Sequence, residues 1–243
     1  RSIGWRVKYH CSLCTSSVIR YLCNRKRSIL FKYMEDLRKT FAGKLLGIKA
    51  IKLQPNDPFT WASGWKSPFY CDNRKTLSYH DVRSFVKLEL VHAILANFPK
   101  ATAVAGVATG AIAQGALVAE ELAMPYAYVR PKPKDHGMKN QIEGELPEGS
   151  KVVVVEDLIS TGGSSLKAVA ALREAGFEVV GMVASYTYGF PVAEEAFKEA
   201  NVQLVTLTDY QSVVEKALET GYINKEDVPM LDEWRKDPAN WKK

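Results

Sequence analysis

The chain has 243 residues, 47% of them apolar and 25% charged, which is ordinary for a globular enzyme with a sizeable core. No apolar run approaches the length that spans a bilayer, so no membrane association is expected. The net charge of +6 is unevenly spread, because residues 1–33 hold eight basic residues and no acid, which leaves 25 basic against 27 acidic residues elsewhere. A continuous basic face for nucleic acid is therefore not predicted.

Residues 1–33 differ from the rest of the chain in more than charge. They contain three of the four cysteines, including the pair Cys11 and Cys14, but a single C-x-x-C without a matching pair does not predict a metal site. A basic, serine-containing, acid-free segment indicates a non-native extension or a transit-like peptide, and we expect one domain over residues 34–243. That domain has Cys71 alone, which fits a reducing compartment such as the cytoplasm.

The first part of the domain, residues 34–78, is predicted to form a small hood. From Met34, apolar residues recur at helical spacing and predict a helix that continues to about Leu53. Residues 55–78 are rich in Pro, Gly, Ser and aromatics, a composition typical of turns and short strands. Two interpretations stay open: the aromatics plug a core, or they stack on a planar base while Lys66 and Arg74 meet anions.

Strands and helices then alternate. A capping-box pattern at Ser78 and Asp81 predicts a helix to about Asn97. A strand over 102–105, a glycine-bounded turn over 106–111 and a helix to about residue 123 follow, and the next strand covers 126–130. A glycine turn between strand and helix can bring backbone N–H groups to an anion, although it is a weak signal alone.

Residues 131–150 form a long segment without apolar periodicity, and cations concentrate at its start. Such loops are usually functional lids or solvated polar segments, and both interpretations stay open. As a lid with Gly137 and Gly144 as hinges, the segment would close cations over a pyrophosphate and exclude water. The cations are Arg130, Lys132, Lys134, His136 and Lys139.

The stretch Val152 to Ser164 carries the strongest chemical pattern. Its four valines predict a strand buried on both faces, and Glu156 and Asp157 follow at the end where open α/β sheets bind ligands. The loop Ser160–Ser164 offers hydroxyls, free N–H groups and a helix start, which suit a phosphate dianion. Because carboxylates repel phosphate, the acids should face sugar hydroxyls or hydrated Mg²⁺ while the loop holds the phosphate. A phosphorylated ribose suits both the acids and the loop. The alternative is a plain strand-turn-helix connection.

The rest of the sequence repeats the alternation, which predicts an α/β fold with a parallel sheet over a core of about residues 79–207. A polar tail, residues 208–243, completes the domain with a helix at about 211–220. The expected elements of the core are a helix at 164–175, a strand at 179–185, a helix at 191–200 and a strand at 202–207.

Three separated motifs resemble known families. The run VVVVEDLISTGGS resembles the phosphoribosyl-pyrophosphate (PRPP) motif of type I phosphoribosyltransferases. The run from Arg130 to Gly137 resembles the mobile catalytic loop of orotate phosphoribosyltransferases, R-x-x-x-K-D-H-G, and residues 59–64 with 67–70 resemble that family's hood. The resemblance implies the type I phosphoribosyltransferase fold, a central parallel sheet flanked by helices with a small N-terminal hood.

The resemblance also implies a function: Mg²⁺-dependent transfer of ribose 5-phosphate from PRPP to orotate, in a homodimer with shared active sites. Lys134, His136 and Arg130 are the implied catalytic residues, Ser160 also touches orotate, and Mg²⁺ is held mainly by PRPP and water rather than directly by the protein. The implied PRPP-binding residues are Arg130, Lys134, His136, Glu156, Asp157, Leu158, Ile159, Ser160, Thr161, Gly162, Gly163 and Ser164.

The sequence departs from the family pattern at several orotate contacts. Pro131 stands where many members have a second basic residue, and Ala62 and Gly110 stand where some have lysine. Lys66 and Arg74 are the nearest candidates to replace them. Two alternative functions remain: a phosphoribosyltransferase for a purine base, and a non-catalytic PRPP-sensing regulator of the same fold.

Overall fold

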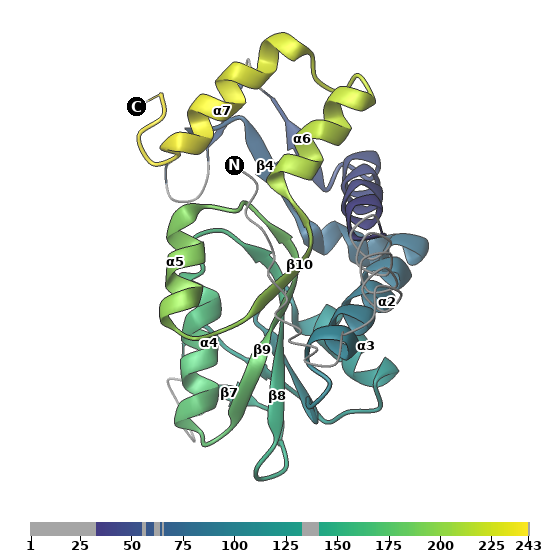
Figure 1. Ribbon diagram of the computed structural model, residues 1–243, viewed down its shortest axis with the longest axis vertical. Helices are drawn as coiled ribbons and strands as arrows, with labels where there is room; N and C mark the ends of the chain where they lie inside the picture. Colours follow the sequence, from purple (N-terminus) through teal and green to yellow (C-terminus); the bar gives the residue numbers. More distant parts are fainter. Residues whose placement is uncertain (1–32, 55–56, 61–63, 65, 133–140, 243) are drawn as a thin grey trace, which may run out of the picture. The chain divides into compact units, whose positions relative to one another are not determined.

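The computed structural model describes residues 33–54, 57–60, 64, 66–132 and 141–242. The chain divides into two units, residues 1–37 and 38–243. In the first unit the described residues, 33–37, are helical; the predicted extension or transit-like segment otherwise lies outside the described residues. The second unit holds all the strands described below (Figure 1).

A six-stranded sheet forms the centre of this unit, in the order β10-β9-β8-β5-β6-β7. The first five strands in that order are parallel, as predicted, and β7 adds an antiparallel edge to β6. β7 falls within the segment predicted to be loop, and its two residues are too few to give a strand pattern. The strands are β5 (Ala103–Val107), β6 (Tyr126–Val129), β7 (Ile142–Glu143), β8 (Lys151–Ile159), β9 (Glu178–Thr187) and β10 (Leu204–Asp209).

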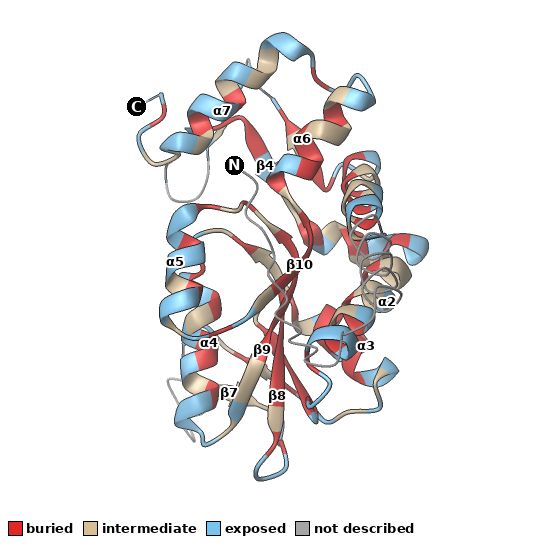
Figure 2. Ribbon diagram, viewed as in Figure 1, coloured by how far each residue is buried: buried red, intermediate tan, exposed pale blue. Residues whose placement is uncertain are grey.

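Helices cover both faces of the sheet, with α2 and α3 on one side and α4 and α5 on the other (Figure 1). Successive residues of a strand point to opposite faces, and the valines of β8 show this directly. Val153 and Val155 pack in one apolar core, whereas Val152 and Val154 pack in the other. Both faces are therefore buried (Figure 2). The helices are α2 (His80–Asn97), α3 (Ile112–Glu121), α4 (Gly163–Glu174) and α5 (Pro191–Glu199).

The segment predicted as a hood contains short strands and a turn of 3₁₀ helix, as expected from its composition. The predicted helix to Leu53 is wrong at its end, since helix stops at residue 47 and residues 51–53 pair with β4 instead. Ser78 is not the N-cap of α2, which begins after Tyr79 without a side-chain cap. The elements are β1 (Ile51–Leu53), β2 (Phe59–Thr60), β3 (Lys66–Ser67), β4 (Phe69–Cys71) and η1 (Asn73–Ser78).

The C-terminal residues are more ordered than a polar tail would be. After α6 (Tyr210–Glu219) and η2 (Lys225–Asp227), a further helix α7 (Val228–Lys236) buries Trp234 completely. Trp234 stacks on Phe69 of β4, with ring centroids 6.2 Å apart and planes 4° apart. Phe69 thus supports the interpretation that hood aromatics plug a core, whereas Tyr70 is 37% exposed and Trp61 and Trp65 lie outside the described residues.

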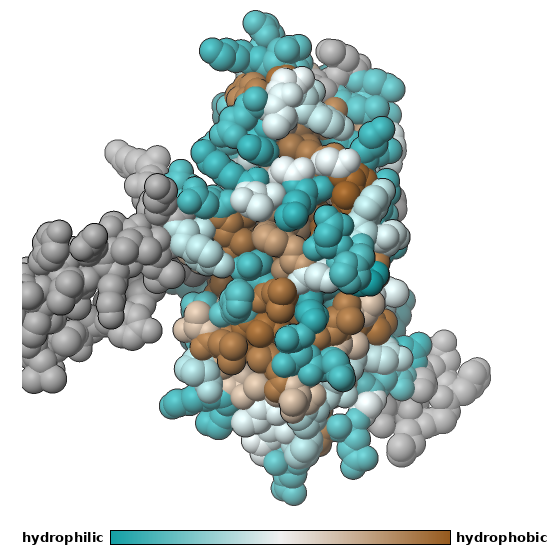
Figure 3. Space-filling model, turned by 90° about the vertical axis from the view of Figure 1, so that its right-hand side faces the viewer, coloured by the Kyte–Doolittle hydropathy of each residue, from teal (hydrophilic) through white to brown (hydrophobic). Residues whose placement is uncertain are grey.

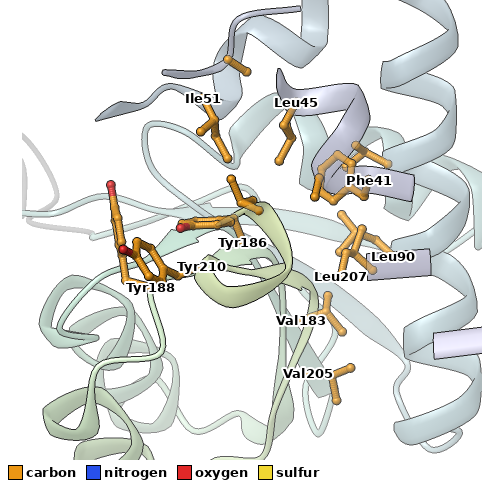
Figure 4. Packing of buried hydrophobic residues seen from close by; sticks show 14 of the residues in the cluster. Phe41, Leu45, Ile51, Leu90, Val183, Tyr186, Tyr188, Val205, Leu207 and Tyr210 are labelled. Atoms are coloured by element: carbon orange, nitrogen blue, oxygen red, sulfur yellow. The ribbon is translucent and has the colours of Figure 1, made fainter. Parts of the chain in front are cut away.

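The same aromatic core extends to Tyr186, Tyr188 and Tyr210, which lie together at the ends of β9 and β10 (Figure 4). Phe69 contacts the Tyr186 ring at a centroid distance of 5.9 Å. Among the described helices, none is both long and apolar enough to cross a lipid bilayer.

Candidate active site

Two acids project from strand β8 rather than following it. The strand was predicted to end at Val155, but its pairing with β9 continues through Glu156 and as far as Ile159. Adjacent side chains of a strand point to opposite faces, so Glu156 and Asp157 occupy different surroundings.

Glu156 is buried, with 4% of its surface exposed. Its Oε2 accepts a hydrogen bond of 2.7 Å from the Ser165 hydroxyl of α4, and its Oε1 accepts one of 2.9 Å from the Asp157 backbone N–H. Burial, reinforced by the Asp157 charge, raises the pKa of Glu156 to about 8. Near neutral pH this carboxyl therefore carries a proton much of the time.

Asp157 lies between the hood and the turn after β5. Its backbone carbonyl accepts a hydrogen bond of 2.6 Å from the Asn73 side chain at the start of η1. Burial raises its pKa, while hydrogen bonds from Glu156 and the backbone oppose that rise. A Cβ on Gly110 would lie 2.0 Å from the Asp157 Oδ2, so a larger residue at this turn position requires the carboxylate to shift. A lysine at that position would displace the carboxylate.

A pocket of about 330 Å³ opens where three distant segments meet: the hood, the turn after β5 and the end of β8. This is the end of a parallel sheet where ligands bind in open α/β folds. The pocket is lined by Cys71, Asp72, Asn73, Arg74, Val107, Ala108, Thr109, Gly110, Glu156, Asp157, Leu158 and Ser164.

The predicted phosphate loop leads from β8 into α4. Gly162 is the N-cap of this 12-residue helix and has a φ of 81°. Glycine has no side chain that could cap the first N–H groups of the helix. A Cβ at Gly162 would approach the Phe197 ring at 2.9 Å, so both conformation and packing require glycine. Thr161, Gly163 and Ser164 are exposed there, which suits anion binding.

Not every predicted binding residue faces the pocket. The Ile159 side chain is fully buried in the apolar core, so only its backbone is left to contact a ligand. Ser160 is partly exposed at the end of the strand. Cys71, Asp72 and Asn73 line the pocket although they were not predicted to; their signal in the sequence is the polar run that interrupts the aromatic hood just before Arg74.

The two proposed substitutes for missing basic residues are placed differently. Arg74 lines the pocket, and its Nε donates a hydrogen bond of 2.7 Å to Asp72 while 60% of the side chain stays exposed. Lys66 donates to the Thr60 hydroxyl at 3.1 Å and is not among the described residues that line the pocket.

The predicted catalytic loop begins at Arg130, directly after β6. The Arg130 N–H donates to the Gln141 carbonyl at 2.8 Å, and its guanidinium lies 3.5 Å from the Glu143 carboxylate. The two ends of the segment are thus tied together across β6 and β7. Lys134 and His136 lie outside the described residues.

Comparison with known proteins agrees with this geometry. A model of the phosphoribosyl transferase domain matches residues 89–218, which contain the sheet strands from β5 to β10 and the acid and phosphate segments. The fold and site therefore define a phosphoribosyltransferase.

Relatives at high identity narrow the class. Orotate phosphoribosyltransferase of Phocaeicola vulgatus is 71% identical over 208 residues, which is 86% of this chain and 98% of that protein. The Porphyromonas gingivalis enzyme of the same name is 64% identical over 86% of this chain and 99% of its own. The crystal structure of orotate phosphoribosyltransferase from Aeropyrum pernix matches 75% of this chain and 99% of its own, at 31% identity and a TM-score of 0.66. This chain belongs to the orotate phosphoribosyltransferase family.

Proposed function

We propose that this protein transfers ribose 5-phosphate from PRPP to N1 of orotate, giving orotidine 5′-monophosphate and pyrophosphate in pyrimidine nucleotide synthesis. The observation that carries the proposal is one pocket in which an acid pair and the start of helix α4 lie side by side. The high identity to named orotate phosphoribosyltransferases supports the choice of base.

In this proposal the ribose hydroxyls of PRPP donate to the Asp157 and Glu156 carboxyls, and residues 160–164 bind the 5′-phosphate. Asp157 acts as an ionised acceptor, whereas Glu156 is fixed by Ser165 and braces the site. The bond from C1′ to the pyrophosphate oxygen breaks as the bond to N1 of orotate forms. The sugar becomes cationic in between, as in glycosyl transfer generally, so the protein contributes position and charge rather than a covalent residue.

We also propose that Mg²⁺ takes part, held mainly by oxygens of PRPP and water. Among the described residues no group of three or more potential ligands gathers to hold a metal by itself. The hard oxygen donors of the acid pair beside the pocket suit the water shell of such an ion. When bound, Mg²⁺ would neutralise charge on the pyrophosphate.

Arg130, Lys134 and His136 are proposed to hold the pyrophosphate and to offset the charge that builds on it as it leaves, with Lys134 the main catalytic cation. Arg130 would exchange its contact with Glu143 for the more highly charged pyrophosphate. The support for Lys134 and His136 is the motif of the family.

For the orotate contacts we propose Ser160 and Arg74. A guanidinium is well matched to a carboxylate, and Arg74 stands at the pocket, unlike Lys66. We expect Arg74→Ala to raise the KM for orotate about tenfold, the effect of losing one charged hydrogen bond. Lys66→Ala is the matched control and should leave the KM for orotate unchanged. An equal rise in both variants would show that Arg74 does not bind orotate specifically.

We further propose a homodimer in the cytoplasm. Apolar surface gathers over helices α2 and α3 on one side of the molecule (Figure 3), and Leu88 and Leu95 of α2 are 40% and 56% exposed. Exposed patches of this kind commonly mark protein interfaces. The lone cysteine after residue 33 fits a reducing compartment.

The proposed function is tested by following the loss of orotate absorbance when the protein, PRPP and Mg²⁺ are mixed. Turnover with orotate that collapses in Lys134→Ala is expected. Turnover with adenine or hypoxanthine instead would identify a purine enzyme, and PRPP binding without turnover of any base would indicate a regulator.

A further inference from the structure

A second, much smaller cavity of about 10 Å³ adjoins the pocket and shares Asn73, Arg74, Gly110 and Asp157 with it. Its polar lining also includes Thr76, Gln114 of α3 and Ser185 of β9. This volume accommodates about one water molecule, and an enclosed water needs two to four polar partners. The lining supplies a carboxylate, a guanidinium, amides and hydroxyls, so the cavity meets both conditions.

Gln114 is the unusual member of this lining. It is 4% exposed, and neither its side-chain oxygen nor its nitrogen has a hydrogen-bond partner among the described residues. Buried amides in proteins are nearly always hydrogen-bonded, to protein or to ordered water. An amide with both polar atoms unpaired beside a water-sized polar cavity points to a bound water.

We propose that Gln114 is a positioning residue for Asp157, acting through one water molecule enclosed in this cavity. The water donates one hydrogen bond to the Asp157 carboxylate and exchanges another with the Gln114 amide. Asn73 already fixes the Asp157 main chain, and Gly110 leaves room for its carboxylate. The water completes this arrangement by fixing the direction in which the carboxylate presents its oxygens to the ribose hydroxyls. The proposal rests on the PRPP-binding part of the proposed function and is independent of the base.

Two substitutions separate positioning from packing. Gln114→Met keeps the volume but removes both polar atoms, so the water loses a partner. Gln114→Ser leaves a larger space, which further water can fill, and it retains a hydroxyl. If Gln114 served packing alone, the serine variant would be the less stable of the two and would bind PRPP more weakly, because cavities destabilise cores. The proposal predicts the reverse order for PRPP binding.

The experiment measures the Kd for PRPP with Mg²⁺ by calorimetry, and the melting temperature of each variant without ligand. We expect Gln114→Met to weaken PRPP binding about tenfold and Gln114→Ser about threefold or less, the loss expected for one hydrogen-bonded contact. The melting temperature should fall more in the serine variant. Gln211→Met, on the exposed face of α6, is the matched control and should bind PRPP as the wild type does.

Wild-type affinity in Gln114→Met, or affinities that follow the melting temperatures, would overturn the positioning role. A crystal structure of the wild type at high resolution without an ordered water between Gln114 and Asp157 would do the same. Wild-type protein that binds PRPP but does not consume orotate would refute the proposed base specificity alone, because the calorimetric comparison does not involve orotate.

Discussion

Glu156 and Asp157 are neighbours in the chain but have different tasks. The Glu156 carboxyl is anchored by Ser165 inside the fold, whereas Asp157 lies against Gly110 at the pocket. The sequence alone indicated an equal pair, because strand alternation beyond Val155 was not anticipated. At the residue scale, the proposed function makes the first acid a structural brace and the second the main ligand for the ribose.

The raised pKa of Glu156 links stability to pH. Its folded-state pKa of about 8 lies above the ordinary value of 4.5, so the folded state binds a proton more tightly. This contribution is fully present below the unfolded pKa and is lost as pH rises through about 8. Glu156→Gln should therefore melt at a higher temperature than the wild type at pH 8, by about 2–4 °C for each kcal/mol recovered, and should match it near pH 5. Equal differences at both pH values, measured by calorimetry, would contradict this account.

Gly110 provides a second residue-scale prediction. In Gly110→Ala the new Cβ forces the Asp157 carboxylate to move, so we expect the KM for PRPP to rise about 10- to 100-fold, as small misplacements of a site group commonly do. Gly47→Ala is the control, because nothing lies within 4 Å of a Cβ there and the residue is helical. That variant should retain the wild-type KM and melt at the same temperature or slightly higher.

At the element scale, strong periodicity made the sheet predictable. The valines of β8 and the alternation with helices predicted a parallel sheet, and the acid and phosphate segments lie at the expected end of it. The elements that were not predicted are short or depend on tertiary contacts. Residues 51–53 continue a helical pattern but form β1 because β4 pairs with them. Helix α7 has only nine residues, and its apolar face is limited to a few side chains such as Leu231 and Trp234. The hood contribution to the pocket was missed because it depends on contacts between residues over 80 positions apart, such as Asn73 and Asp157.

Helix α7 is predicted to be essential to stability despite its polar sequence. Trp234 is fully buried on Phe69, so Trp234→Ala should lower the free energy of unfolding by about 3–5 kcal/mol, the usual loss for a large buried aromatic. Urea denaturation measures the change. Tyr222→Ala, at a 41% exposed position, is the control and should cost much less.

At the scale of the whole molecule, the proposed dimer predicts that a charge introduced at the interface breaks the dimer, whereas one introduced elsewhere on the surface does not. Leu95→Lys places a charge in the apolar surface over α2 and should shift the protein from dimer to monomer in sedimentation at micromolar concentration. Val192→Lys on α5 is the matched control, since Val192 is 54% exposed on the other side of the sheet. Monomeric wild-type protein, or dissociation by the control, would argue against an interface at α2.

Strand β8 also restricts how the gene can vary in length. Valines packed on both faces and two acids of opposite orientation share one strand, which pairs with β5 and β9 and keeps one register with β9 from Val153 to Ile159. Deleting or inserting a single codon between Val152 and Asp157 would turn each later side chain to the opposite face, so that a deletion would put Leu158, and an insertion Glu156, in the place of Asp157. We expect this stretch to accept substitutions among β-branched residues while rejecting every insertion or deletion in a library screened for growth without pyrimidines.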